Sequence, residues 1–143
     1  MRIISLGAAL LAVLSLSACE MGPRSGRGLR LPEGDVQRGK IAFRELGCPT
    51  CHDVAGDPGA GKMKGVVVLG GEVTRIETYG ELVTSIVNPS HEISRRYPKE
   101  DVTVGDVSKM KNFNHVMTVA QLIDLTTYLQ SKYELIREPR YIP

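Results

Sequence analysis

The feature that most constrains this chain is a short run with two cysteines and a histidine, Cys48-Pro49-Thr50-Cys51-His52. Cysteines three residues apart can bond to the two vinyl groups along one edge of a porphyrin, and the imidazole that follows them can reach the iron. The run therefore predicts one covalently bound haem c, attached through Cys48 and Cys51 and ligated by His52. The length of 143 residues allows one modest domain around it.

Two other chemistries also use a Cys-x-x-Cys pair. A thioredoxin-like redox pair requires a βαβ context, and no such pattern is visible in residues 35–60. A zinc site requires a second pair of ligands at matching spacing, whereas the remaining histidines, His91 and His115, are single and scattered. The sequence therefore favours haem attachment.

Residues 1–18 are predicted to be an export signal peptide. Arg2 stands before an apolar run, residues 3–18, that contains nothing more polar than serine. This run is too short to cross a bilayer as a mature helix, which takes roughly 20 residues. We therefore expect the haem motif to function in an oxidising compartment outside the cytoplasm.

The end of the apolar run, Leu16-Ser17-Ala18-Cys19, resembles the lipobox of bacterial lipoproteins. The resemblance implies cleavage before Cys19 and lipidation of its sulfur, which would anchor the protein to a membrane. Ordinary secretion, with Cys19 free or removed, is the alternative. Residues 19–33 are rich in Gly, Pro, Arg and Ser and are predicted to be a flexible tether, because they cannot bury enough apolar surface to fold.

The first helix of the mature domain is predicted to start with Asp35 as its N-cap and to end near Leu46. Gly39 lies inside it and lowers helix stability by roughly 1 kcal/mol relative to alanine. Its presence suggests that another helix crosses there at close range. A middle helix is predicted over residues 79–87, where Asn88-Pro89 closes it.

The last helix has the clearest boundary signal in the chain. Thr118 and Gln121 have the spacing of a capping box, and Met117 has the position of a hydrophobic staple that packs on Leu122. The apolar stripe of this helix continues to about Tyr133. Before it, the apolar run at 66–69 is expected to be extended and packed on the haem, and residues 88–116 are expected to form a long irregular loop that wraps the cofactor.

These features resemble class I cytochrome c. The resemblance is carried by Gly34-Asp35-Val36, Gly39-Lys40, Phe43, the haem motif and Leu125-Thr126-Thr127-Tyr128-Leu129. It implies an all-α fold in which a few helices and long loops wrap round one haem. The cytochrome domain would cover residues 34–137, followed by a C-terminal tail at 138–143. It also implies that Gly39 and Phe43 meet Leu125 and Tyr128.

The middle of the chain departs from the family pattern. No clear Gly-Pro-x-Leu segment follows the haem motif, so the proline whose carbonyl braces the proximal imidazole in that family has no assigned counterpart. The chain also lacks tryptophan, so contacts to the haem propionates must come from other residues. The candidates are Arg75, Tyr79, Arg95 and Tyr97.

Three methionines after the haem motif could supply the second iron ligand. Met63 follows His52 closely in a Gly-rich stretch, and Met117 is explained by the hydrophobic staple of the last helix. Met110, with Phe113 after it, resembles the Met-Pro-x-Phe/Tyr segment of the family and is the favoured distal ligand. Met117 is the alternative, and the two remaining histidines are weaker candidates.

An iron held by His52 and Met110 has no open position, which suits outer-sphere electron transfer and disfavours oxygen binding or peroxide cleavage. The sequence thus predicts an electron carrier, not an enzyme, anchored to the inner or outer membrane and facing the periplasm. We expect redox proteins as partners and no small-molecule substrate. The formal net charge of +2 gives no reason to expect nucleic acid. Two alternatives stay open: a cytochrome subunit of a larger redox enzyme, and a haem peroxidase or gas-binding protein with a labile sixth ligand.

Overall fold

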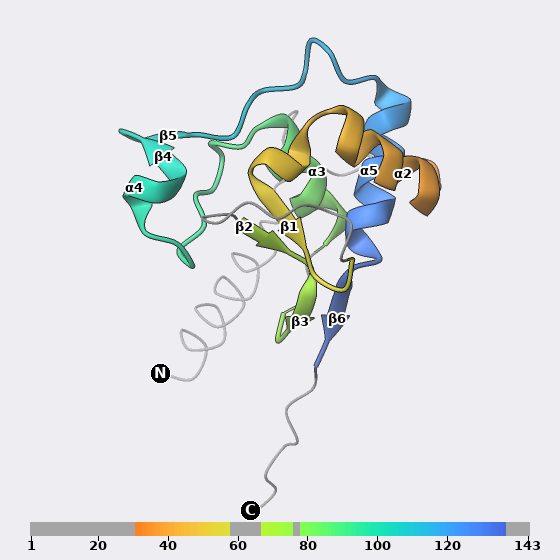
Figure 1. The fold of residues 1–143 in the computed structure, drawn as a ribbon, viewed down its shortest axis with the longest axis horizontal. Coiled ribbons are helices and arrows are strands. Elements are labelled where there is room, and N and C mark those ends of the chain that lie inside the picture. The colour runs from red at the N-terminus through yellow and green to blue at the C-terminus, as the bar shows by residue number, and fades with distance from the viewer. Residues whose placement is uncertain (1–30, 58–66, 76–77, 137–143) are drawn as a thin grey trace, which may run out of the picture. The chain divides into compact units, whose positions relative to one another are not determined.

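The computed structural model describes residues 31–57, 67–75 and 78–136. The three longest helices of this part lie together, and α4 lies apart from them with β4 and β5 (Figure 1). In chain order the elements are α2 (Val36–Glu45), the 3-10 turn η1 (Cys48–Thr50), β1 (His52–Val54), β2 (Val67–Leu69), β3 (Gly71–Val73), α3 (Tyr79–Val87), α4 (Lys99–Val102), β4 (Thr103–Val104), β5 (Val107–Ser108), α5 (Val119–Gln130) and β6 (Tyr133–Leu135).

Local side-chain chemistry sets both ends of α2. The carboxylate of Asp35 accepts a hydrogen bond from the Arg38 N–H at 2.8 Å, which satisfies a donor of the first turn and confirms the predicted N-cap. Leu46 is the C-cap, close to the predicted end. Gly47 follows with φ of 73°, a left-handed conformation that glycine adopts without strain and that stops the helix just before Cys48.

Capping boxes start the other two long helices. The hydroxyl of Thr118 accepts from the Gln121 N–H at 3.1 Å, and the Gln121 side-chain carbonyl accepts from the Thr118 N–H at 2.9 Å, as predicted. Thr78 and Glu81 form the same reciprocal pair at the start of α3. The bounds of α3 confirm the middle helix predicted at 79–87.

Helices α2 and α5 touch where Gly39 lies. A Cβ at position 39 would overlap the carbonyl oxygen of Asp124 and would lie 2.6 Å from the Cβ of Tyr128, so only glycine fits. One turn further along α2, the Phe43 ring packs on the Tyr128 ring, with 5.8 Å between their centroids and 58° between their planes. Leu125 is buried in the same core. The helix contact implied by the resemblance is therefore confirmed.

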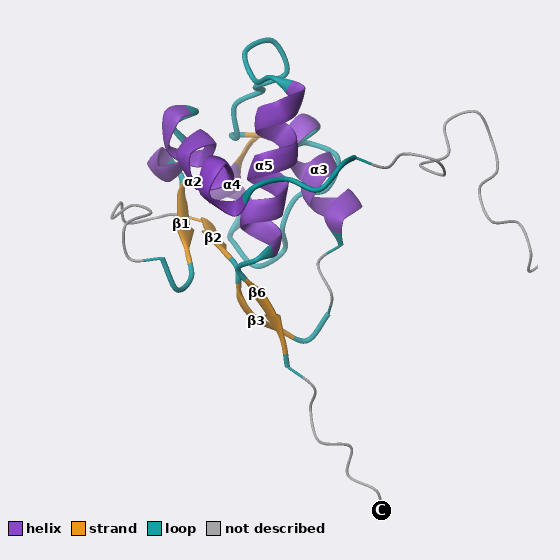
Figure 2. Ribbon diagram, turned by 90° about the vertical axis from the view of Figure 1, so that its right-hand side faces the viewer, coloured by secondary structure: helices purple, strands orange, loops and turns teal. Residues whose placement is uncertain are grey.

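The hydrophobic core lies among α2, α3 and α5, which Figure 2 shows together. It also includes side chains from the segments around the haem motif, which are thereby fixed to the helices. Its buried members are Phe43, Val54, Leu82, Ile86, Leu125, Tyr128 and Leu129, and the half-buried side chains packed on them are Leu46, Cys48, Leu69, Met117, Leu122 and Tyr133.

Three short two-stranded ladders accompany the helices. β1 pairs with β2 in parallel, β3 pairs with β6 in parallel, and β4 pairs with β5 in antiparallel. The last helix was expected to continue to about Tyr133, but α5 ends at Gln130 because Tyr133 begins β6 opposite Gly71. The Gly71 N–H donates to the Lys132 carbonyl at 2.8 Å and draws the chain into this ladder. The described residues combine helices with three short ladders, and this mixture does not decide the fold class. The all-α class therefore stays a prediction.

The long segment before α5 was expected to be irregular, and that expectation is wrong for residues 99–108. A short helix, α4, leads into the β4–β5 hairpin, which turns at Gly105 with φ of 62°. Lys99 reaches across to the Asp106 carboxylate at 2.7 Å. The hairpin valines Val104 and Val107 are exposed, so no buried apolar face marked these strands in the sequence.

An ion pair closes the α2–α5 contact at the start of α2. The Arg38 guanidinium donates to both carboxylate oxygens of Asp124, at 2.8 and 3.1 Å, and the Asp35 N–H donates to the same carboxylate at 2.7 Å. These hydrogen bonds, led by that of Arg38, hold the pKa of Asp124 below its ordinary value. The charged form of Asp124 therefore stabilises the folded state.

This pKa shift predicts an acid-dependent loss of stability. Because the folded pKa is the lower one, the contribution of Asp124 is complete above its unfolded pKa, about 3.8, and is lost as pH falls through the folded value. At neutral pH, Asp124→Asn is expected to melt below the wild type, and the gap is expected to close as pH falls below about 4. Thermal melts of both proteins across this range test it; a gap that keeps its size in acid would contradict it.

Candidate haem-attachment site

The haem motif forms one tight turn at the C-terminal end of α2. Gly47 precedes it, Pro49 occupies its first turn, and the Cys51 N–H donates to the Cys48 carbonyl at 3.1 Å. A 3-10 helix has three residues per turn, so side chains at i and i+3 lie on the same side. Cys48 begins this turn and Cys51 caps it, so the two cysteines lie one turn apart.

The two thiols differ in their surroundings. Cys48 is half-buried and packs on the hydrophobic core, whereas Cys51 is exposed, and both are free thiols. Burial raises the pKa of Cys48 to about 11, so this group is a neutral thiol at pH 7. A redox-active Cys-x-x-Cys pair needs a lowered thiol pKa, which a helix N-terminus commonly provides. The environment of Cys48 therefore raises the thiol pKa, whereas the environment of a thioredoxin-like pair lowers it.

His52, the first residue of β1, has one ring nitrogen already engaged. Its Nδ1 lies 3.2 Å from the Val67 carbonyl oxygen on β2, directly opposite in the ladder. Burial lowers the pKa of His52, which favours the neutral imidazole. Because a carbonyl can only accept, Nδ1 carries the proton in this bond and Nε2 has the free lone pair. A metal-binding histidine is usually oriented by such a bond.

The backbone group that faces the His52 ring could not be assigned from the sequence. It is the carbonyl of Val67 on β2, whereas the resembled family uses a proline carbonyl beside its proximal imidazole. The Val67 N–H also donates to the Cys51 carbonyl at 3.1 Å, so β2 is fixed to both residues of the motif. The apolar run at 66–69 predicted an extended segment, but a side-chain pattern cannot reveal which backbone carbonyl faces a histidine.

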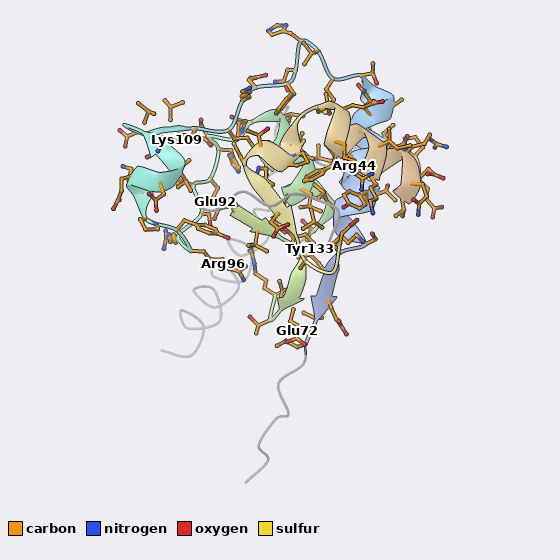
Figure 3. The ribbon with its side chains drawn as sticks, in the orientation of Figure 1. Arg44, Glu72, Glu92, Arg96, Lys109 and Tyr133 are labelled. Atoms are coloured by element: carbon orange, nitrogen blue, oxygen red, sulfur yellow. The ribbon has the colours of Figure 1, made fainter. Side chains whose placement is uncertain are left out.

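Met110, the favoured second ligand, lies on a separate segment between β5 and α5. Its side chain is half-buried and its N–H donates to the Ser108 hydroxyl at 3.2 Å. Its neighbour Lys109 lies beside α4, where its ammonium donates to the Glu100 carbonyl at 2.6 Å (Figure 3). Cys48, Cys51 and His52 thus belong to one local unit, and Met110 belongs to a different segment of the chain.

The other candidate ligands are placed as follows. Met117 packs against the hydrophobic core together with Leu122, which agrees with its predicted place in a hydrophobic staple. His91 and His115 are exposed. Met63 lies outside the described residues. Within the described ranges, no group of three or more His, Cys, Asp and Glu side chains could hold a metal ion.

A buried carboxylate, which no sequence pattern marked, ties the end of the haem-motif segment to the helices. Asp57 accepts from the Lys40 ammonium at 2.8 Å and from the Tyr128 hydroxyl at 3.0 Å, and the Lys132 ammonium lies 3.9 Å away. Burial, followed by the bond to Asp57, raises the pKa of Tyr128. This network links α2, the residues after β1 and α5 through hydrogen bonds that favour the charged carboxylate.

The four residues predicted to contact the haem propionates differ in their burial and in their hydrogen-bond partners. The Tyr79 hydroxyl at the start of α3 is buried and has no hydrogen-bond partner among the described residues. Burial raises its pKa. Arg75 forms an ion pair with Glu81 at 3.1 Å, and Arg95 is exposed. The Tyr97 hydroxyl accepts from a backbone N–H of β2, so it already has a partner.

The predicted signal peptide, Cys19 and most of the tether lie outside the described residues. Among the residues that are described, no helix has both the length and the apolar character needed to cross a membrane. Comparison of the chain with protein-family models, curated protein sequences and solved structures gives no match.

Proposed function

We propose that this chain is a monohaem c-type cytochrome that carries single electrons between redox proteins. The observation that carries the proposal is the state of His52: its Nδ1 donates to the Val67 carbonyl, which leaves the lone pair of Nε2 to bind a metal. Two free thiols precede it on a single turn, Cys48 at the start of the turn and Cys51 at its C-cap. A covalent haem requires two thiols and an imidazole in this order.

We propose that side chains of this part of the chain would hold a haem in the following way. Cys48 and Cys51 would form the thioether bonds and His52 would ligate the iron. The buried Tyr79 hydroxyl is unsatisfied among the described residues, and such a group usually has a partner in a native protein. An O–H group of this kind can donate to a propionate carboxylate.

The residues of the chain serve this function by holding the ligands still. When bound, haem supplies an iron that takes up and releases one electron at a time. The Val67 carbonyl fixes the orientation of the His52 ring, and the Asp57 network ties the segment after β1 to α2 and α5. Ligands held in one geometry in both redox states require little reorganisation when an electron moves.

Met110 is proposed as the second iron ligand. Met117 already packs in the core beside α5, whereas Met110 lies in an irregular segment and makes no ladder pairing. Histidine and methionine together leave no open position for a substrate, which is why we propose a carrier and not an enzyme.

We also propose that the carrier is a lipoprotein on the periplasmic side of a membrane. Cys19 would carry the lipid, and residues 19–33 would let the domain move between partners near the membrane surface. Contacts with those redox partners would be small and short-lived, at the low end of protein interface areas.

Visible spectroscopy of the purified protein tests the proposed function. The reduced wild type is expected to show the spectrum of a low-spin c-type haem, and the oxidised form is expected to show the weak band at long wavelength that methionine ligation produces. Met110→Ala is expected to lose this band, because the iron loses its second ligand. Met117→Leu, a change of similar volume in the core, is the matched control and is expected to keep the band.

Two outcomes would contradict the proposal. A purified wild type without haem absorbance would remove its basis. A high-spin wild-type spectrum that shifts when carbon monoxide or cyanide is added, without any change of redox state, would show an open iron position and favour a gas-binding or peroxidase function.

A further inference from the structure

One peptide group on β2 is hydrogen-bonded on both sides. The carbonyl of Val67 faces Nδ1 of His52 at 3.2 Å. The N–H of Val68, which belongs to the same amide group, donates to the Tyr97 hydroxyl at 2.9 Å. The three groups therefore form a chain in which Tyr97 is connected to the proximal histidine through a single planar amide.

The surroundings of Tyr97 hold its hydroxyl in this position. The residue is half-buried, on the segment between α3 and α4. Its neighbour Arg96 lies on the part of this segment that passes β2 (Figure 3). Pro98 follows, which disfavours the helical region for the backbone of Tyr97, and α4 begins directly after Pro98. Tyr97 is thus attached to a short constrained stretch and not to a free loop end.

We propose that Tyr97 is a positioning residue that adjusts how strongly His52 donates to the haem iron. This inference rests on the proposed function. When a hydroxyl accepts from the Val68 N–H, the amide is polarised and its carbonyl becomes a better acceptor, an effect of about 10–30% per bond. A stronger bond from Nδ1 to the Val67 carbonyl makes the imidazole a more basic ligand. A more basic ligand stabilises the oxidised iron and lowers the reduction potential.

The test compares the haem-loaded full chain with variants that change this hydroxyl. Tyr97→Phe removes only the oxygen, and Tyr97→Leu removes the oxygen and the ring. Both are expected to raise the reduction potential by a similar amount. In NMR spectra of the reduced protein, the Val68 amide proton and the His52 Nδ1 proton are both expected to move upfield because their hydrogen bonds weaken.

A control variant separates this effect from a loss of stability. Thr78→Ala removes the N-cap of α3, a neutral side chain whose hydroxyl accepts from the Glu81 N–H at 3.2 Å. Loss of such a cap lowers stability, typically by about 1 kcal/mol. This variant is expected to melt earlier while it keeps the wild-type potential and the wild-type His52 signal.

Each other outcome would overturn the inference. An unchanged potential and an unchanged His52 Nδ1 signal in Tyr97→Phe would show that the hydroxyl does not act on the histidine. A potential shift in Tyr97→Leu alone would assign the effect to the ring, and an equal shift in Thr78→Ala would assign it to stability. A wild-type chain without covalent haem would instead refute the proposed function, and this inference with it.

Discussion

Replacement of both Cys48 and Cys51 by serine is expected to abolish covalent haem in the purified protein. No other residue of the motif can form a thioether bond to a porphyrin, and His52 alone holds haem only by coordination. Intact mass spectrometry after denaturation measures the result directly. The wild type, produced in a host that attaches haem to exported proteins, is expected to have the mass of the processed chain with its Cys19 lipid plus one haem. The double variant is expected to keep the lipid and to lack the haem.

The third cysteine provides the matched control. Cys19→Ser removes one thiol that lies outside the motif, so this variant is expected to keep the covalent haem while it loses the lipid and the attachment to membranes. A double serine variant that still contains covalent haem would place the attachment elsewhere. A wild type whose mass contains no haem would contradict the proposed function.

Much of the helical frame could be predicted because its signals are local. Asp35, Thr118 and Asn88 act at helix ends within a few residues of their partners, and a sequence shows such spacings directly. The meeting of Gly39 with Tyr128 joins distant positions, and it followed from the family resemblance, not from spacing. The end of α5 was missed because Tyr133 continues the apolar stripe and only the pairing with Gly71 shows that it is a strand.

The sequence predicted the side chains of the candidate site but not the backbone groups that hydrogen-bond to them. Cysteine and histidine are chemically distinctive, so the residues that would bind haem are visible in the sequence. The Val67 carbonyl and the Val68 N–H belong to the backbone, which every residue shares, so no residue type marks their role. Asp57 was missed for a different reason: its partners Lys40 and Tyr128 lie on two helices that only the fold brings to it.

The contact between α2 and α5 predicts opposite effects for two glycine-to-alanine changes. Gly39→Ala would place a methyl group against the Asp124 carbonyl oxygen, which is backbone and cannot rotate away. The helices would have to separate, and the free energy of unfolding is expected to fall by about 3 kcal/mol, more than the roughly 1 kcal/mol that alanine gains in helix propensity. A Cβ added to Gly80 in α3 would have nothing within 4 Å, so Gly80→Ala is expected to raise stability by about 0.5 kcal/mol.

Chemical denaturation of the wild type and both variants measures these changes, with the haem content of each sample matched. The comparison is informative because the same atoms are added to a helix in both cases and only the space around them differs. A loss in both variants would mean that glycine is required for a reason other than the helix crossing. No loss in Gly39→Ala would mean that α2 and α5 do not touch at this point, and the frame that fixes the Cys48 turn would then need another origin.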